Sequence, residues 1–299
     1  MNAFFQFVVE GLTIGSFYAL VALGYTMVYG IIRLINFAHG DLFMVGAFIG
    51  WTSLATLASA HLPLALALLA AFSASMAATG GLGVVIARVA YQPLLRAPRL
   101  SILITALGVS LLLENAVLLM YGAGFRTYPH LLTQAGLNLH DVRITFAQIG
   151  IVAASFSLML ALYFFVHHTF LGTAMRALAI DQDAARLMGI DVERMIHLTF
   201  FIGSVLAAVA GVMEGLYYTQ INFFMGFVLG LRAFTAAVLG GVGNIPGAMA
   251  GGFLIGLLEA FGAGYVSSRW TDVFVFGVLI AVLVIKPTGL FGERVVERM

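Results

Sequence analysis

Long runs of apolar residues, separated by short polar segments, repeat along the whole of this sequence. Nine runs can be marked, over residues 4–31, 42–60, 62–87, 101–121, 144–166, 197–219, 228–243, 247–265 and 270–286. About 20 apolar residues at the helical rise cross the hydrocarbon core of a membrane, and the runs lack the alternation that barrel strands need. The pattern predicts an all-α membrane protein, a polytopic transmembrane helical bundle with broken helices that forms a single domain over residues 1–299. It has eight or nine crossings, because the short, glycine-rich run at 228–243 is either a crossing or only a half-helix.

Composition supports lipid as the main solvent of this chain. Hydrophobic residues make up 62% of the sequence and charged residues only 9%, whereas about a quarter of an ordinary soluble domain is charged. Cysteine is absent, which excludes disulfides, thiolate catalysis and cysteine-ligated metals. No H-E-x-x-H motif is present and the net charge is only +1, so we predict no metal, no cofactor and no nucleic-acid partner.

The basic residues predict how the spans are oriented. They gather in three regions, which contain Arg88, Arg96 and Arg99, then Arg176, Arg186 and Arg194, and finally Lys286, Arg294 and Arg298. The positive-inside bias places such regions in the cytoplasm, so we expect a cytoplasmic C-terminus and an external segment at 122–143. With nine crossings the N-terminus is outside and Arg33 lies at the inner end of the first span; with eight, the N-terminus moves to the inside.

The longest predicted cytoplasmic loop, residues 167–196, contains a short helix with both ends marked. Asp181 suits the N-cap, Asp183 adds a negative charge to the first turn, and Gly189 suits the end of the helix. Apolar residues recur there at near-helical spacing, and polar residues occupy the remaining surface. The apolar positions are Ala177, Ile180, Ala184, Leu187 and Met188, and the polar positions are Arg176, Asp181, Asp183 and Arg186. Such a helix either rests on the lipid surface or presses into a groove of a soluble partner.

The stretch NFAHGD, residues 36–41, places polar groups inside an apolar chain. Ionisable groups at mid-helix cost about 2.5–3.5 kcal/mol each on insertion scales. Asn36, His39 and Asp41 flank Gly40, which predicts a break between two helices. In one interpretation Asp41 is the N-cap of the next span, and Asn36 and His39 satisfy free backbone groups. In the other, the break also lines a translocation pathway, as broken helices do in many transporters.

A second break is predicted in LGGVGNIPGAMAGGFLIG, residues 239–256. Proline after an apolar run indicates that one helix ends at Ile245 and another starts near Pro246. Both breaks run into similar segments, MVGAFIG and MAGGFLIG, which suggests an internal repeat with the two breaks near one site. The candidate pathway residues at this break are Gly240, Gly241, Gly243 and Asn244. The glycines also suit close helix packing, so the two roles remain open.

Three carboxylates lie within apolar runs: Glu114, which is beside Asn115, Glu214 and Glu259. Each must be protonated, hydrogen-bonded or paired. Arg232 and Arg269 are the available cationic partners, and we expect pairing between helices rather than substrate contact.

The sequence resembles one family of membrane transporters. The loop motif R-A-L-A-x-D-x-x-A-A-x-L-x-G-I is similar to the loop by which permeases of ABC importers engage their ATPase subunits. VALGYTMVYGIIRLINFAHGDLFMVGAF and AFTAAVLGGVGNIPGAMAGG resemble the LivH-type permeases of bacterial branched-chain amino acid importers. The resemblance extends from GLTIGSFYAL at residue 11 to KPTGLFG, which ends at residue 292.

The resemblance implies a subunit of the bacterial inner membrane that forms part of the pathway for branched-chain amino acids. Its implied partners are a homologous second permease, two cytoplasmic ATP-binding subunits and a periplasmic amino-acid-binding protein. The implied ATPase-coupling residues are Arg176, Asp181, Asp183, Arg186, Leu187 and Gly189. The chain has no G-x-x-x-x-G-K-[ST] and its one lysine is Lys286, so ATP hydrolysis must come from another polypeptide. Permeases of this family also carry urea or short amides, which leaves the substrate open.

Two other classes of function are compatible with parts of the sequence. An intramembrane enzyme could use His39 and Asp41, or Glu114, as an acid–base pair, but the sequence has no G-x-S-x-G or metal motif to support it. A stand-alone channel or ion-coupled carrier would transport without an ATPase and would leave the capped helix without a role. We therefore predict a transporter subunit that is not an enzyme.

Overall fold

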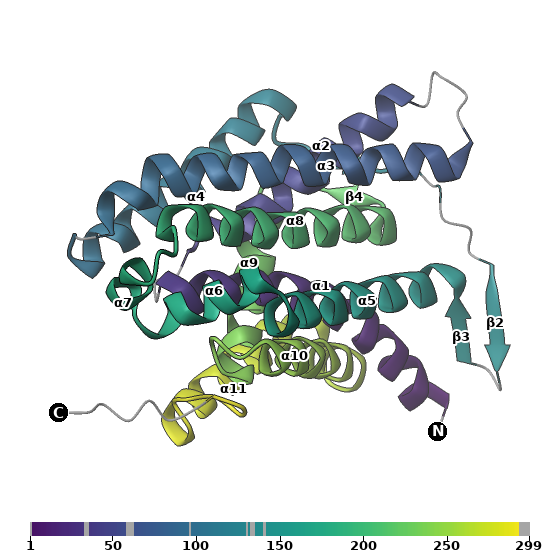
Figure 1. The fold of residues 1–299 in the computed structure, drawn as a ribbon. Helices are drawn as coiled ribbons and strands as arrows, with labels where there is room; N and C mark the ends of the chain where they lie inside the picture. The colour runs from purple at the N-terminus through teal and green to yellow at the C-terminus, as the bar shows by residue number, and fades with distance from the viewer. Residues whose placement is uncertain are drawn as a thin grey trace.

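The computed structural model describes residues 2–32, 36–57, 63–95, 97–129, 131, 135–139 and 142–292. The predictions for Arg33, Arg96, Arg294 and Arg298 lie outside these residues. The described chain is mostly helical (Figure 1). Its elements are α1 (Asn2–Ile32), α2 (His39–Leu57), α3 (Leu64–Ile86), η2 (Ala87–Tyr91), η3 (Gln92–Leu94), α4 (Arg99–Tyr121), β1 (Arg126–Thr127), β2 (Gly136–Leu139), β3 (Val142–Thr145), α5 (Phe146–His168), α6 (Phe170–Ile180), α7 (Gln182–Leu187), α8 (Val192–Tyr218), β4 (Gln220–Ile221), α9 (Met225–Gly240), α10 (Ile245–Tyr265), η4 (Ser268–Trp270) and α11 (Thr271–Ile285).

Eight helical stretches of the described chain are long and apolar enough to cross a membrane, which confirms the predicted polytopic bundle. Their boundaries differ from the apolar runs where polar residues continue a helix. The second span begins at His39 rather than 42, the third continues to Leu94 rather than 87, and the sixth begins at Val192 rather than 197. Hydropathy marks the lipid-exposed part of a helix, whereas backbone hydrogen bonding continues into its polar flanks.

The remaining apolar helix, α9, has 16 residues and is about 24 Å long at the helical rise. It begins beside α2, where Gly226 faces Gly40, and ends where Gly241 packs against Gly292. It therefore carries the chain back through the bundle as a short ninth pass. The start of α1 and the end of the described chain consequently lie at opposite ends of the bundle (Figure 1).

The bundle has two ends: the α7 end, where α7 lies, and the hairpin end, where β2 and β3 lie. At the α7 end, the Gln182 side chain of α7 donates to the Ile31 carbonyl near the end of α1, over 3.2 Å. At the hairpin end, the Gln6 side chain near the start of α1 accepts from the Arg143 backbone N–H of β3, over 3.0 Å. β2 and β3 form an antiparallel pair there, and a second antiparallel pair joins β1 to β4.

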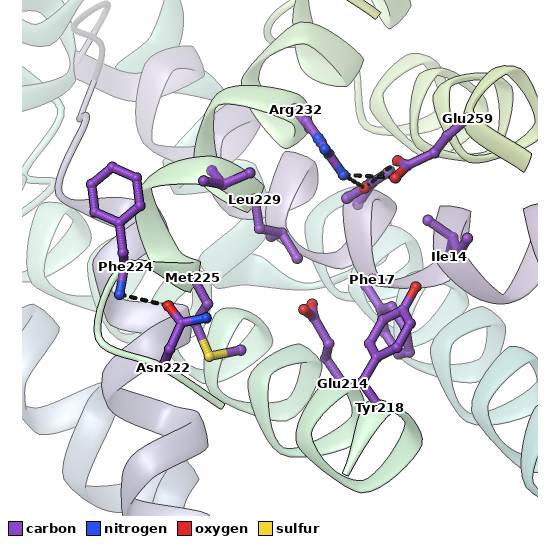
Figure 2. Close-up of a pocket in the computed structure, with 12 residues that line it drawn as sticks. Ile14, Phe17, Glu214, Tyr218, Asn222, Phe224, Met225, Leu229, Arg232 and Glu259 are labelled. Atoms are coloured by element: carbon purple, nitrogen blue, oxygen red, sulfur yellow. Dashed lines mark hydrogen bonds and ion pairs between the residues drawn. The ribbon is translucent and has the colours of Figure 1, made fainter. Parts of the chain in front are cut away.

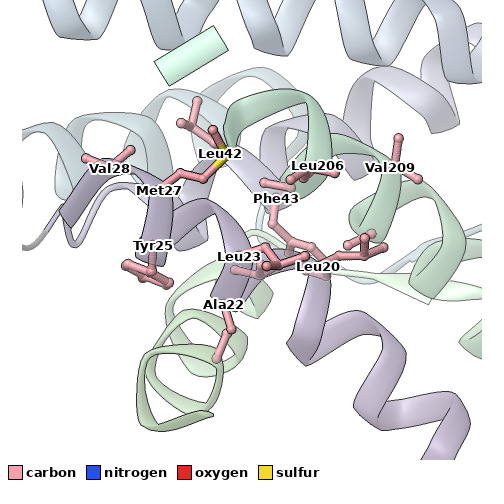
Figure 3. Close-up of a cluster of buried hydrophobic side chains, with 14 of the residues drawn as sticks. Leu20, Ala22, Leu23, Tyr25, Met27, Val28, Leu42, Phe43, Leu206 and Val209 are labelled. Carbon is pink, nitrogen blue, oxygen red and sulfur yellow. The ribbon is translucent and has the colours of Figure 1, made fainter. Parts of the chain in front are cut away.

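The core lies where α1, α2 and α8 meet. Figure 3 shows its apolar side chains, among them Leu20, Leu23 and Met27 of α1, Leu42 and Phe43 of α2, and Leu206 and Val209 of α8. Small residues let the backbones approach in this region. A Cβ on Gly46 of α2, for example, would lie 2.9 Å from the Ala208 Cβ of α8.

Tyr128 fastens the hairpin end to this core. It follows β1, is fully buried, and its hydroxyl donates to the Ala47 carbonyl of α2 over 2.7 Å. Burial raises the pKa of the Tyr128 phenol, so it remains a neutral donor.

Candidate functional site

The predicted break at residues 36–41 is a tight turn that starts α2 inside the bundle. The His39 backbone N–H donates to the Asn36 carbonyl over 3.1 Å. The Tyr91 hydroxyl of η2 donates to Asn36 Oδ1 over 2.6 Å, and Asn36, His39 and Asp41 are all buried. The backbone carbonyl of Asn36 thus closes the turn, and its side chain connects the turn to the end of the third span through Tyr91.

Asp41 does not cap α2, contrary to the sequence-based interpretation. The helix already begins at His39, so Asp41 is its third residue, and its Oδ2 accepts from the Ser110 hydroxyl of α4. Asp41 Oδ1 is buried and has no hydrogen-bond partner within the described residues. A carboxylate in the first turn still suits the helix dipole. The position therefore links α2 to α4.

His39 lies between α1 and α8 rather than over free groups at the break. Its ring meets the Tyr25 ring edge-on with centroids 4.9 Å apart, and a Cβ on Gly24 would collide with its Nε2. Nε2 has no hydrogen-bond partner in the described part of the chain. Gly24 therefore makes the space that this buried ring occupies.

Ser110→Ala is expected to lower the free energy of unfolding by about 1–3 kcal/mol, because it leaves the buried Asp41 carboxyl without its hydroxyl donor. Unfolding in mixed detergent micelles measures the change. Ser157→Ala is the matched control, because the exposed Ser157 hydroxyl only bonds the Ala153 carbonyl of its own helix. Equal losses in the two variants would show that the Ser110–Asp41 contact contributes nothing.

The second break lies at the α7 end, between α9 and α10. Gly241 and Gly243 have φ values of 106° and 95°, in the left-handed region that favours glycine. Asn244 caps α10, since its Oδ1 accepts from the Gly247 N–H over 2.8 Å, and its Nδ2 donates to the Phe291 carbonyl over 2.9 Å. Gly240 ends α9, and α10 begins at Ile245, one residue before the predicted start. The first break packs against Gly226 and Gly230 near the opposite end of α9.

A network of charged and hydroxyl groups joins α1, α9, α10 and α11. Arg232 Nη1 lies 2.6 Å from Glu259 Oε1, which confirms Arg232 as the partner of one predicted carboxylate. Its Nη2 lies 2.7 Å from Asp272 Oδ1, and its Nη1 donates to the Tyr18 hydroxyl over 3.0 Å. Tyr18 in turn donates to Glu259. Sequence reasoning missed Tyr18 and Asp272, because a tyrosine in an apolar run and an acidic residue at the start of one carry no signal of their partner.

The other residues predicted to be buried and polar behave differently. Glu114 of α4 is buried, and its Oε1 has no hydrogen-bond partner among the described residues. Its neighbour Asn115 is exposed and donates to the Leu111 carbonyl of its own helix. Glu214 Oε2 is also shielded and unpartnered in the described structure. Arg269 forms no ion pair with the described residues, so it was wrong as a partner for these carboxylates.

A cavity of about 310 Å³ lies beside the charge network, between α1, α8, α9 and α10 (Figure 2). Its lining consists of Ile14, Phe17, Tyr18, Glu214, Tyr218, Asn222, Phe224, Met225, Val228, Leu229, Arg232 and Glu259. The lining therefore combines aliphatic and aromatic side chains with two carboxylates and a guanidinium. Of the predicted site residues, the cavity brings together Glu214 and Glu259. It does not include Asn36, His39, Asp41 or the glycines of the second break.

The predicted capped helix is present at the α7 end, as α7. Asp181 Oδ1 accepts from the N–H groups of Asp183 and Ala184 over 2.8 and 3.0 Å, which confirms the N-cap. Gly189 follows with a φ of 84°, which confirms it as the stop. Asp181 takes an extended backbone and separates α6 from α7, so the apolar positions between Ala177 and Met188 lie on two helices and not on one.

Four of the five predicted apolar positions of this segment are exposed, and the fifth, Ala177, is half-buried. Ile180, Leu187 and Met188 are 81%, 89% and 83% exposed, whereas Leu178 and Ala185 are buried against the bundle. Arg176 bonds the His167 carbonyl and the Thr173 hydroxyl, and Arg186 lies 3.9 Å from Asp183 in an exposed pair. Beside α7, a groove of about 610 Å³ is lined by residues of η3, α7 and α8, including Gln92, Arg186 and Glu193. Exposed apolar side chains at this place suit either a groove of a soluble partner or the lipid surface.

Comparison with known proteins gives one consistent result. The family described as branched-chain amino acid transport system, permease component, matches residues 7–283. The high-affinity branched-chain amino acid transport system permease protein BraD of Pseudomonas aeruginosa is 46% identical over 99% of this chain and 98% of its own. The corresponding LivH of Escherichia coli K12 is 43% identical over the same shares.

More distant similarity extends to an archaeal relative and to a solved structure. A probable branched-chain amino acid permease of Methanocaldococcus jannaschii is 28% identical over 96% of this chain and 92% of its own. An ABC transporter of the metal-chelate type, solved in an inward-facing conformation, superposes with a TM-score of 0.52 at 16% identity. The superposition covers 93% of this chain and 86% of the other, and at this identity it shows a shared fold alone.

Proposed function

The chain belongs to the family of branched-chain amino acid transport permeases, and we propose that it is the permease subunit of an ABC importer for branched-chain amino acids. Identity of 43–46% over almost the entire chain to two high-affinity permeases is the observation that carries this proposal. These relatives are transport subunits and not enzymes. An intramembrane acid–base site at His39 and Asp41 or at Glu114 is therefore set aside.

The chain is a multi-pass membrane protein, and we place it in the bacterial inner membrane with the α7 end in the cytoplasm. The basic residues Arg176, Arg186 and Arg194 of that end support this orientation. The described chain then ends in the cytoplasm, and the hairpin end faces the periplasm. There a periplasmic amino-acid-binding protein would deliver the substrate.

ATP hydrolysis is proposed to act through α6 and α7. The exposed side chains of Leu187 and Met188 would enter a cytoplasmic ATP-binding subunit, and Asp181 and Gly189 would hold α7 in the orientation that presents them. A push on α7 reaches the bundle directly, because Gln182 bonds the carbonyl of Ile31 at the end of α1. Two ATP-binding subunits and a homologous second permease would complete the complex, and alternating access would follow from rocking of the two permeases.

Leu187→Asp combined with Met188→Asp is expected to reduce leucine-stimulated ATP hydrolysis of the assembled transporter by about tenfold or more. The few hot-spot side chains near the centre of an interface each contribute about 2 kcal/mol or more to binding, and a buried charge at such a position removes that contribution. The stability of the chain should not change, because both side chains are exposed. Leu187→Met combined with Met188→Leu keeps the apolar surface and should retain activity. Wild-type ATP hydrolysis in the aspartate variant would remove α7 from the coupling interface.

Uptake in cells tests the proposed function directly. A bacterial strain that lacks its own branched-chain amino acid importers would express this chain together with the proposed second permease, ATP-binding subunits and binding protein. Uptake of radiolabelled leucine, urea and acetamide would then be measured. Leucine uptake that depends on this chain and on ATP supports the proposal. Uptake of urea or acetamide alone would assign the chain to the amide-transporting members, and uptake without an ATP-binding subunit would indicate a channel or carrier.

A further inference from the structure

The cavity beside Arg232 has the size and the mixed apolar and charged lining of a site for one small amphipathic molecule. Its volume of about 310 Å³ lies at the small end of the range of ligand pockets. Ile14, Phe17 and Leu229 line the same cavity as the carboxylates of Glu214 and Glu259, and Figure 2 shows the Glu214 side chain reaching from α8 into the space among them.

The charge balance of the cavity favours a cation. Arg232 is already engaged: four of its five N–H donors are used, by Glu259, Tyr18 and, through two bonds, Asp272. The cavity lining thus holds two carboxylates, those of Glu214 and Glu259, against one guanidinium, which also pairs with Asp272 outside the lining. Arg232 is therefore not free to receive a ligand carboxylate.

Glu214 is the group left to bind a ligand. Its Oε2 is shielded from solvent and has no hydrogen-bond partner among the described residues. A buried carboxylate is costly unless it is paired or hydrogen-bonded. A primary ammonium group placed beside Glu214 would donate the hydrogen bond that Oε2 lacks within the described residues.

The opening of the cavity suits the other polar end of an amino acid. Tyr218, Phe224 and Val228 form its exposed rim, next to β4 at the hairpin end. Asn222 Oδ1 accepts from the Phe224 N–H over 2.9 Å, which leaves the Asn222 amide NH₂ to donate. A ligand carboxylate at the rim can meet this donor and water while the aliphatic side chain lies against Ile14, Phe17 and Leu229.

We propose that this cavity is a binding site for one zwitterionic aliphatic amino acid, with Glu214 holding the ammonium group and Ile14, Phe17 and Leu229 contacting the side chain. The inference rests on the proposed function for its substrate class. With the hairpin end facing the periplasm, the site lies on the side where the substrate enters. The permease itself, and not only a separate binding protein, would then select for the ammonium group.

The experiment measures equilibrium binding of tritiated L-leucine to the full chain in lipid nanodiscs. Two competitors each lack one charged group: isopentylamine lacks the carboxylate, and 4-methylpentanoate lacks the ammonium. Isopentylamine is expected to displace leucine at a concentration at least about tenfold lower than 4-methylpentanoate, as the loss of one charge-assisted hydrogen bond implies. Equal displacement by the two, or stronger displacement by the acid, would overturn the proposal.

Three variants test whether leucine binds in this cavity. Glu214→Gln should weaken leucine binding at least about tenfold, whereas Glu114→Gln, which alters another membrane carboxylate with an unpartnered oxygen, should leave it unchanged. Val228→Trp narrows the opening of the cavity without removing a polar group and should also weaken leucine binding. Wild-type affinity in Glu214→Gln, or equal losses in the two glutamine variants, would overturn the proposal. If Glu214→Gln does not fold, Val228→Trp and the competitors on the wild-type chain decide.

Failure of this inference can be told apart from failure of the proposed function. If the cells described above take up leucine but the folded chain binds none, the cavity site is wrong and the importer assignment stands. If the cells take up only urea or acetamide and the chain binds no leucine, both fail.

Discussion

Arg232→Met should destabilise the membrane-inserted chain by about 3–5 kcal/mol, the usual result of removing one partner from a buried ion pair. The side chains of Arg232 and Glu259 are only 19% and 14% exposed, so the carboxylate of Glu259 cannot recover its solvation when the guanidinium is lost. Tyr18 and Asp272 lose a charged partner in the same step. Unfolding in mixed detergent micelles, followed by far-ultraviolet circular dichroism, measures the change.

Two further variants make this result specific. Arg194→Met removes an arginine that also pairs with a carboxylate, but Arg194 is 83% exposed, so the expected cost is about 0–1 kcal/mol. Arg232→Met combined with Glu259→Met replaces a charged pair by apolar side chains and should be less destabilising than Arg232→Met alone. A loss in Arg232→Met no larger than that in Arg194→Met would mean that the network does not hold α9, α10 and α11 together.

Gly40→Ala is the second change with a large expected effect, about 3 kcal/mol of lost stability. A Cβ at Gly40 would lie 2.7 Å from the Gly230 Cα and would collide with the Gly226 carbonyl oxygen. Both are backbone atoms of α9, so no side chain can turn aside, and α2 must move away from α9. The displacement would shift His39 and Asp41, which lie on either side of Gly40.

Gly108→Ala is the matched control for this prediction. Gly108 lies within α4, and a Cβ added there would meet no atom within 4 Å. Alanine is the better helix former, so this variant should gain about 0.5–1 kcal/mol. Gly230→Ala tests the other side of the crossing, since its Cβ would lie 2.9 Å from the Gly40 Cα. If Gly40→Ala behaves like Gly108→Ala, the close crossing of α2 and α9 does not contribute to stability.

What could be predicted from the sequence depends on short-range physics. The membrane spans were found because the transfer of about 20 apolar residues into lipid is nearly additive along a run, and lipid requires each helix to satisfy its own backbone. The cap of α7 was found because Asp181 bonds N–H groups only two and three residues away. The stop at Gly189 is a property of one residue's backbone.

The partners across the bundle could not be predicted in this way. Asp41 was interpreted as a cap from its place after a break, but its hydroxyl donor is Ser110, which is 69 residues away on α4. Arg232 was a candidate partner for three carboxylates, and only the packing of α9 against α10 chose Glu259. In lipid no hydrophobic force separates one apolar helix face from another, so small residues and polar contacts between helices decide the neighbours.

The sequence by itself thus determined that this chain is a helical membrane protein, where its spans and breaks lie, and that its capped segment is a helix. Its similarity to known permeases also indicated the family. The tertiary structure decided that α2 starts inside the bundle against α9, that Leu187 and Met188 face outward, and that Glu214 shares a cavity with Arg232 and Glu259. The physical reason is distance along the chain: apolar transfer and capping act within a few residues, whereas a cavity and an ion network exist only where helices from distant segments meet.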